Sequence, residues 1–292
     1  MQDKLTTSKY TRKMISLVQI SRKKIDKQFR LLTWKMRSKP GFLILGAMKS
    51  GTTSLYYYLT QHPQIVPAMT KEVHFFDGGR EGGSDDYQKG ISYYLSYFPY
   101  VSELNGGKQT FEATPSYIFH PLVPERIHET LPNVKMVVLL RNPTQRAISH
   151  YFHKKRTGVE TLPMMEAFQK EETRLKPIFS SKDYFNKDLR DFSYKMRGHY
   201  AEQLERYFKL FPREQFLILS SEDFFTNTQD CLNRIFKFIN LEMNVKIEDL
   251  SPKFVAKNKE TVSQEVVDYL NDYFRPKNQA LYQLLGTDFG WK

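Results

Sequence analysis

The apolar residues of this chain gather in short blocks that alternate with longer mixed stretches. Three apolar runs lie at residues 42–45, 135–140 and 215–219. A glycine loop and a helical stretch follow the first run, and an Arg-Asn-Pro turn and another helical stretch follow the second. An amphipathic helical stretch precedes the third run. Short apolar strands that alternate with helices predict an α/β fold, with a central parallel sheet covered by helices on both faces.

The ends of these runs predict where ligands bind. Gly46 opens the loop after the first run, and Arg141 directly follows the second run. In open parallel sheets, ligands bind beyond the carboxyl ends of the strands. The glycine loop and Arg141 are therefore expected to lie at the same edge of the sheet.

The chain divides into a basic N-terminal extension at residues 1–38 and one globular domain at residues 39–292. Its length of 292 residues fits one large α/β domain better than two small ones. The extension is rich in Lys and Arg, and its apolar residues recur at loosely helical spacing. It is expected either to be a solvated, partly ordered helix or to make a peripheral contact with an anionic membrane or glycan.

Net charge and cysteine content narrow the class of protein. A formal net charge of +12 indicates a surface that attracts anions, although charge alone does not say which anions. Because Cys231 is the one cysteine, no disulfide can form within the chain, and a cytoplasmic location is expected. The apolar stretch at residues 14–20 is far shorter than the roughly 20 residues of a membrane span, so no membrane crossing is expected.

The glycine loop after the first run predicts a P-loop-like phosphate site. Its backbone N–H groups, the following helix and Lys49 can all face one anion. However, Thr52 stands after the second glycine, where a nucleoside-triphosphate loop has its lysine. Arg141 also stands where an acid that organises Mg²⁺ is expected. A nucleotide site without a metal is therefore preferred, while a kinase or triphosphatase stays the alternative enzyme.

Two motifs together resemble a known family. Residues 49–55 resemble the 5′-phosphosulfate loop of sulfotransferases that use 3′-phosphoadenosine 5′-phosphosulfate (PAPS), and residues 141–151 resemble their 3′-phosphate motif. The resemblance continues to the end of the chain and is closest to the heparan-sulfate sulfotransferase branch. Further matching strings lie at residues 71–77, 111–117, 197–207, 272–278 and 290–291.

The resemblance implies PAPS as co-substrate, its desulfated form PAP as product, and no metal. PAPS carries charge at two separate places, so it needs two anion sites. The planar guanidinium of Arg141 and the hydroxyl of Ser149 suit the 3′-phosphate. The implied donor-binding residues are Lys49, Ser50, Gly51, Thr52, Thr53, Ser54, Arg141, Ser149, Tyr200, Lys257, Asn258 and Lys259.

The implied catalytic residues are Lys49, Glu72 and His74. Lys49 would meet the charge that grows on the leaving phosphate oxygen. Glu72 is the preferred general base for the acceptor proton. In an extended segment, His74 would share a face with Glu72, where it would orient a reactant or act as the base itself.

The acceptor stays open between a carbohydrate and a small molecule, and between a hydroxyl and an amine. Ala113 stands where heparan-sulfate enzymes commonly have a lysine, and no cysteine pair braces residues 257–259. His150 and His153 have no further ligand nearby in the sequence, so no metal site is expected. A nucleic-acid partner is not expected, because it would leave the ordered motifs unexplained. A non-catalytic relative that binds anionic glycans stays the alternative outside the enzymes.

Overall fold

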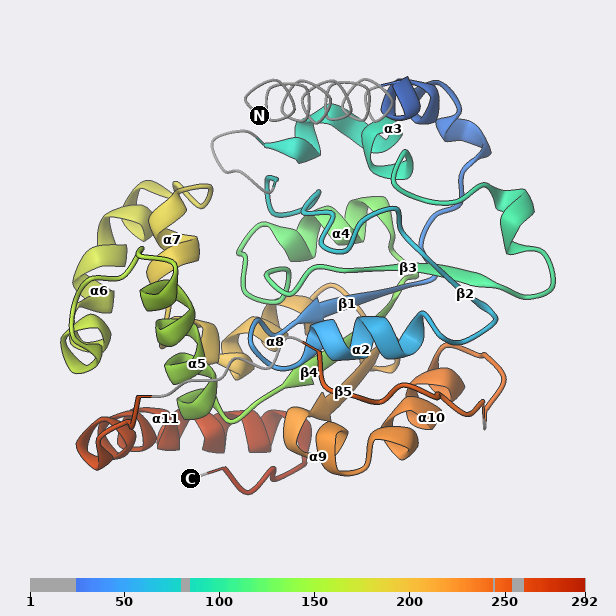
Figure 1. Ribbon diagram of the computed structural model, residues 1–292. Helices are drawn as coiled ribbons and strands as arrows, with labels where there is room; N and C mark the ends of the chain where they lie inside the picture. Colours follow the sequence, from blue (N-terminus) through green and yellow to red (C-terminus); the bar gives the residue numbers. More distant parts are fainter. Residues whose placement is uncertain (1–24, 80–84, 244, 254–259, 292) are drawn as a thin grey trace, which may run out of the picture.

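A five-stranded parallel sheet forms the centre of the described structure, a computed structural model that covers residues 25–79, 85–243, 245–253 and 260–291 (Figure 1). The strand order is β2-β3-β1-β4-β5. This confirms the predicted fold class. The strands are β1 (Phe42–Gly46), β2 (Ile65–Pro67), β3 (Gln109–Ala113), β4 (Lys135–Leu140) and β5 (Phe216–Ser220).

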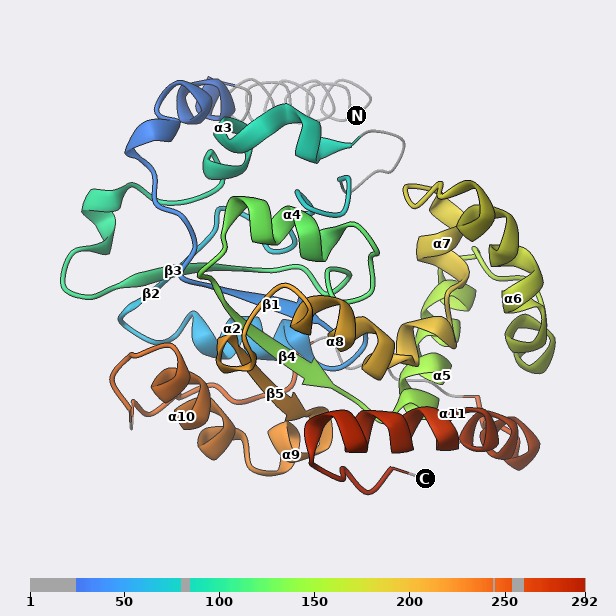
Figure 2. The same ribbon diagram turned by 180° about the vertical axis from the view of Figure 1, so that it is seen from behind.

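Helices cover both faces of the sheet, as the blocks of apolar residues predicted (Figures 1 and 2). The α-helices are α2 (Thr52–Leu59), α3 (Gly90–Leu95), α4 (Val123–Thr130), α5 (Pro143–Arg156), α6 (Met164–Ser181), α7 (Lys187–Phe192), α8 (Tyr200–Phe208), α9 (Ser221–Thr226), α10 (Thr228–Phe238) and α11 (Gln264–Leu285). Short 3-10 helices are η1 (Trp34–Met36), η2 (Asp86–Lys89), η3 (Val101–Leu104), η4 (Met196–Gly198) and η5 (Arg213–Gln215).

The central strands are buried on both sides, which explains their uninterrupted apolar runs. Leu43 and Leu45 of β1 belong to a core that α4 and α8 close. Phe42 and Ile44 point to the opposite face, into a core that α2 and α10 close. Alternate residues of one strand thus anchor both helical layers.

A third apolar cluster joins α5, α6 and α11 beyond the edge of the sheet (Figure 1). Gly198 lies at this junction, and a Cβ atom added there would stand 2.6 Å from the Phe274 ring and 2.9 Å from Pro143 Cβ. Only a residue without a side chain allows this approach. The junction fixes α5, the helix that follows Arg141, against the rest of the molecule.

The described part of the N-terminal extension packs on the globular body. Residues 25–32 are helical, and they lie beside α3 (Figure 1). The buried guanidinium of Arg37 donates to the Phe98 carbonyl at 2.8 Å, and Arg30 donates to the same carbonyl at 2.8 Å. The helical spacing seen in the sequence is thus real for residues 25–32, while the domain boundary after residue 38 stays a prediction.

Two features are absent from the described residues. No helix in this part of the chain is long and apolar enough to cross a membrane. The same residues contain no group of three or more His, Cys, Asp and Glu side chains placed to hold a metal ion.

Candidate active site

The glycine loop lies between β1 and α2 and is closely packed. A Cβ atom on Gly46 would stand 2.5 Å from Ile118, and one on Gly51 would stand 2.7 Å from the ring of Phe225. Gly51 caps α2 with a φ of 92°, a left-handed conformation that favours glycine. The first N–H groups of α2 therefore open at the carboxyl end of β1, as an anion site requires.

The ammonium group of Lys49 lies near several other positive charges. Burial is the largest cause that lowers the Lys49 pKa. The neighbouring positive charges lower it further, namely those of Arg156, Arg141, Arg146 and Lys154. No salt bridge joins Lys49 to an acid among the described residues. An anion that binds beside Lys49 would favour its charged form and raise its pKa again.

The loop also carries a polar group that can form a hydrogen bond to a ligand. The Ser50 hydroxyl is buried and has no hydrogen-bond partner in the described structure. The Ser50 carbonyl accepts a hydrogen bond from Ser221 at 2.9 Å, which holds the loop against α9. Thr52 and Thr53 are the first residues of α2, and Ser54 accepts the backbone N–H of Lys253 at 2.9 Å.

Arg141 brings the second predicted motif against the first. It leaves the end of β4 and donates to the Lys49 carbonyl at 3.1 Å. The Tyr200 hydroxyl donates to the Arg141 carbonyl at 2.9 Å, so Tyr200 acts here on the backbone of the motif. Ser149 lies farther along α5, half-buried. Lys257, Asn258 and Lys259 lie outside the described residues.

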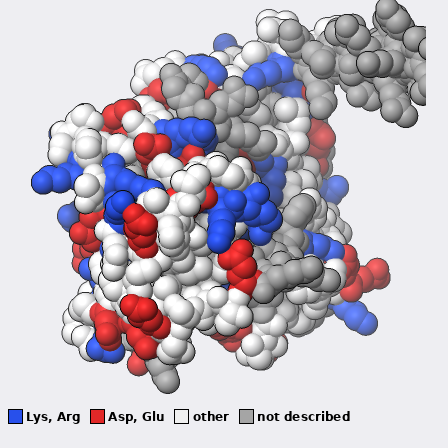
Figure 3. All heavy atoms as spheres, turned by 60° about the vertical axis from the view of Figure 1, so that its left-hand side comes forward, with Lys and Arg blue, Asp and Glu red and all other residues white. Residues whose placement is uncertain are grey.

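Several basic side chains act on the charge of Lys49, namely Arg141, Arg146, Lys154 and Arg156. Figure 3 views the molecule from the side that is at the left in Figure 1, and several Lys and Arg side chains group near the middle of that face. The C-terminal end of α5 adds His153, Lys154, Lys155 and Arg156. This concentration of charge suits a ligand with several negative groups.

Glu72 and His74 meet, but not as the sequence predicted. Both have left-handed backbone conformations, with φ of 61° and 58°. The expectation of an extended segment was therefore wrong, since the chain turns at each of these residues. The turn still brings the His74 Nε2 atom within 3.5 Å of a Glu72 carboxylate oxygen.

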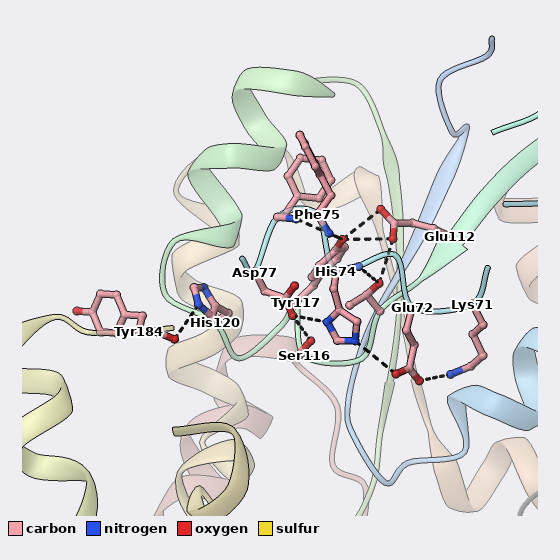
Figure 4. A network of polar contacts seen from close by, with 12 residues as sticks. Lys71, Glu72, His74, Phe75, Asp77, Glu112, Ser116, Tyr117, His120 and Tyr184 are labelled. Carbon is pink, nitrogen blue, oxygen red and sulfur yellow. Dashed lines mark hydrogen bonds and ion pairs between the residues drawn. The ribbon is translucent and has the colours of Figure 1, made fainter. Parts of the chain in front are cut away.

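A line of polar contacts runs from Lys71 through Glu72 and His74 to Asp77 (Figure 4). Lys71 donates to the Glu72 carboxylate. The other nitrogen of the His74 ring, Nδ1, lies 2.9 Å from Asp77 Oδ2, and Ser116 donates to the same Asp77 oxygen. His74 is thus held between two carboxylates.

The two carboxylates set the charge of the imidazole. Burial disfavours a charged His74, but its hydrogen bonds to Asp77 and Glu72 outweigh burial and raise its pKa to about 9. Burial also opposes ionisation of Glu72, yet His74 and Lys71 together lower the Glu72 pKa to about 2. At neutral pH the imidazole therefore carries a proton and Glu72 is ionised, so of these two groups only the Glu72 carboxylate can accept a proton.

A buried carboxyl group, that of Glu112, lies beside this line of contacts (Figure 4). Glu112 of β3 accepts hydrogen bonds from Tyr94 at 2.7 Å and from Thr114 at 3.0 Å, and Tyr117 donates to it at 3.2 Å. Tyr117 in turn accepts the backbone N–H of Phe75 at 3.0 Å. Burial raises the Glu112 pKa to about 7, against the effect of these donors.

Sequence analysis missed the supporting residues Asp77, Glu112, Ser116 and Tyr117. They lie inside the strings at residues 71–77 and 111–117 that carry the family resemblance. Their position inside these strings was the available signal, because β3 carries the polar Gln109 and Thr110 as well as Glu112 and no apolar stretch marks Glu112 out.

An open pocket borders His74 and Asp77. Arg197 lines it and is buried, with one guanidinium nitrogen that has no partner among the described residues. The Arg197 guanidinium lies over the Phe119 ring, 4.3 Å from its centre. The lining residues are His74, Asp77, Gly78, Gly79, Ser116, Phe119, His120, Tyr184, Phe185, Asn186, Lys187, Leu189, Arg190 and Arg197.

Comparison with known proteins decides the family. Residues 39–275 match the family model described as the sulfotransferase domain. The chain belongs to the sulfotransferase family. A sulfotransferase is an enzyme of sulfuryl transfer, so the kinase and triphosphatase alternatives and the non-catalytic alternative are set aside.

Similar proteins include sulfotransferases of several kinds. This sulfotransferase is 28% identical to the membrane-associated sulfotransferase kil1 of Dictyostelium discoideum, over 88% of this chain and 68% of that protein. It is 30% identical to human heparan sulfate glucosamine 3-O-sulfotransferase 6, over 87% of this chain and 74% of that protein. A solved sulfotransferase from Alicyclobacillus acidocaldarius superposes with a TM-score of 0.66 at 28% identity, covering 86% of this chain and 98% of that chain.

Proposed function

We propose that this sulfotransferase takes its sulfuryl group from PAPS and transfers it to a hydroxyl or amine of a carbohydrate or small-molecule acceptor. The observation that carries the proposal is the order of side chains along the carboxyl edge of the sheet. The backbone of Glu72 bonds to the end of β3, Lys49 follows β1, and Arg141 follows β4. These strands are neighbours, so a base, a transfer site and a nucleotide site follow one another along one edge.

The loop residues fit the charges of PAPS. The charges that lower the pKa of Lys49 most are those of neighbouring cations, and the buried Ser50 hydroxyl lacks a partner in the described structure, so both can serve a phosphosulfate. Arg141 and Ser149 would hold the 3′-phosphate. The first residues of α2 would hold the 5′-phosphosulfate. PAPS supplies an activated sulfuryl group when bound. Lys49 would stabilise the charge that develops on the leaving phosphate oxygen.

Glu72 would take the proton that the acceptor loses. Its carboxylate is ionised at neutral pH, and the charged imidazole of His74 fixes its position. Asp77 holds that imidazole from the other side. A second carboxylate thus positions the base through His74, as in other catalytic sites where one group orients the next.

The pocket beside His74 is our candidate for the acceptor site. Its aromatic residues suit a sugar ring or another flat ring, and Arg197 suits an anionic substituent on it. A carbohydrate hydroxyl is supported by the relative that is named for 3-O-sulfation of glucosamine in heparan sulfate. The single cysteine supports a cytoplasmic location as part of this proposal.

Nucleotide protection tests the donor. PAP should raise the unfolding midpoint of the protein, since a ligand that binds only the native state stabilises it by roughly 2.7 kcal/mol at a hundredfold excess over Kd. ATP with Mg²⁺ is the control and should have a much smaller effect. A shift with ATP and Mg²⁺ but none with PAP would show that the donor is not PAPS.

The same assay with a variant locates the site. Lys49→Ala should abolish most of the PAP protection and should also slow transfer from labelled PAPS. Ser38→Ala, outside the proposed site, should keep both. If Lys49→Ala bound PAP as well as the parent does, the glycine loop would not be the phosphosulfate site.

A further inference from the structure

The N-terminal helix presents a row of large apolar side chains to the outside. Ile25, Phe29, Leu32 and Met36 are 69%, 55%, 83% and 62% exposed. Ile25, Phe29 and Leu32 are four and three residues apart, which places them on one stripe of the helix at residues 25–32, and Met36 follows four residues later in η1. Nine large hydrophobic residues are exposed in the described structure, and four of them lie within these twelve positions. The stripe is therefore a concentrated patch, unlike the scattered apolar residues of an ordinary surface.

The opposite side of this helix is fixed to the body. Lys27 donates to the Tyr93 hydroxyl at 3.3 Å and lies over the Tyr93 ring. Arg30 donates to the carbonyls of Ser96 and Phe98, at 2.5 Å and 2.8 Å. Leu31 and Trp34 pack against the core of the sheet.

These anchors decide which side of the helix faces the body. The contacts of Lys27, Arg30, Leu31 and Trp34 leave the stripe turned outward. Burial of Leu32 or Phe29 against the protein would require those contacts to break. The exposed stripe is thus a property of the docked helix.

Basic residues flank the stripe along the chain. Lys35 and Lys39 are exposed beside its C-terminal end. Residues 1–24, which lead into the helix, contain seven Lys and Arg and a single acid, Asp3. A helix with an apolar stripe and flanking cations is the type that lies in the surface of an anionic bilayer.

From this combination we infer that residues 25–36 dock the enzyme on a membrane surface that contains anionic phospholipids. Phe29 and Leu32 enter the boundary between headgroups and acyl chains, while the flanking lysines bind headgroup phosphates. An anionic glycan would explain the bases but not the apolar stripe. A second copy of this chain would bring two strongly basic surfaces together, which repel each other.

Docking in this way orients the enzyme. The helix and α3 lie at one end of the molecule, and α9, α10 and α11 lie at the other (Figure 1). The membrane would therefore contact the α3 end, and α11 would face water. Membrane docking does not depend on the donor and acceptor proposed above, because residues 25–36 lie outside the proposed reaction site at the carboxyl edge of the sheet.

Vesicle binding tests the inference. The full-length protein should sediment with vesicles of phosphatidylcholine and phosphatidylserine, and much less with phosphatidylcholine alone. Phe29→Ser combined with Leu32→Ser should weaken binding by roughly tenfold or more, since two large side chains no longer leave water. The unfolding midpoint and the transfer rate in solution should stay unchanged.

A matched variant controls for the loss of exposed apolar surface elsewhere. Met69→Ser combined with Met243→Ser removes two side chains that are 51% and 47% exposed, and it should bind vesicles like the parent. Equal vesicle binding by the parent and the Phe29 and Leu32 variant would overturn the inference. So would binding to immobilised heparin without vesicle binding, or a dimer in solution that this variant abolishes.

Discussion

The His74 side chain shows how a few contacts fix a protonation state. It lies between Glu72 and Asp77, and its pKa of about 9 keeps it charged through the neutral range. A charged imidazole cannot accept a further proton, so it serves as an orienting cation. Glu72, between Lys71 and His74 in the line and partly exposed, carries the carboxylate that we propose takes up the acceptor proton.

Glu72→Gln should slow transfer without loss of donor binding. The amide keeps the shape of the side chain but has no basicity, so turnover should fall by roughly a hundredfold or more. PAP affinity should stay within a few fold of the parent, because Lys49 and Arg141 are unchanged. Steady-state kinetics at saturating PAPS and acceptor, with PAP titration, would measure both.

His74→Ala provides the contrast for that experiment. It removes the orienting cation and should reduce turnover, but less than Glu72→Gln does. Near-parental turnover of Glu72→Gln together with an inactive His74→Ala would identify His74 as the base.

The charge of His74 also links folding to pH. Its pKa rises from an ordinary value near 6.5 in the unfolded chain to about 9 in the fold. The resulting stabilisation is complete below pH 6.5 and is lost as pH rises from 6.5 to 9. This rise in pKa corresponds to at most roughly 3 kcal/mol.

Urea unfolding at pH 6.5 and pH 9 would measure that contribution. The parent should lose more stability across this range than His74→Asn, which keeps a polar side chain but does not titrate. Parallel pH profiles for the two proteins would show that the ion pairs with Glu72 and Asp77 add nothing to the fold.

At the scale of elements, Arg141 joins two loops that come from neighbouring strands. The Arg141 guanidinium donates to the Lys49 carbonyl, and the Tyr200 hydroxyl donates to the Arg141 carbonyl. The proposed 3′-phosphate site and the proposed phosphosulfate loop thus form one unit at the ends of β1 and β4.

Arg141→Ala should separate two nucleotides that differ by one phosphate. PAP affinity should fall by roughly tenfold to a hundredfold, the value of a charge-assisted hydrogen bond. Adenosine 5′-phosphosulfate lacks the 3′-phosphate and should lose much less. Calorimetric titration of both ligands gives the comparison, and equal losses would mean that Arg141 only shapes the Lys49 loop.

Gly198 tests the packing of α5 on α11. Gly198→Ala places a methyl group within 3 Å of Phe274 and Pro143, so the free energy of unfolding should fall by roughly 1 to 3 kcal/mol. Gly41→Ala is the control, because Gly41 is exposed and the nearest atom there is the end of the Gln109 side chain. Urea unfolding of both variants would show whether the junction tolerates a side chain.

The sequence predicted those elements whose environment is uniform. β1, β4 and β5 read as apolar runs because helices cover both of their faces. β2 has only three residues, one of them Pro67, and β3 carries the polar Gln109, Thr110 and Glu112. Partners distant in the chain, such as Tyr94 for Glu112, satisfy these side chains, and no local pattern records that.

The same distinction applies to the site. The positions of Lys49 and Arg141 at one edge of the sheet were predictable, because the glycine loop with Lys49 and the turn with Arg141 each follow an apolar run. Ser116 and Asp77 were not, because their contact joins segments 39 residues apart. Left-handed conformations at Glu72 and His74 likewise depend on tertiary contacts, so the predicted extended geometry was wrong.

At the scale of the whole molecule, the proposed reaction site and the proposed membrane contact occupy two separate regions. The catalytic edge faces one side, and the stripe of Phe29 and Leu32 lies on a helix beside α3 (Figure 1). The helical spacing of the extension was visible in the sequence. Its orientation was not, because the inward contacts of Arg30 and Arg37 depend on the carbonyls of Ser96 and Phe98.

The strand order has a consequence for synthesis of the protein on the ribosome. β1 is made first, yet both of its neighbours, β3 and β4, come 60 or more residues later in the chain. The glycine loop therefore stays unsupported while the nascent chain lengthens, since long-range parallel pairing must wait for its partner. Nascent chains stalled before β4 emerges should be cut by protease within β1, and those stalled after β5 emerges should be protected.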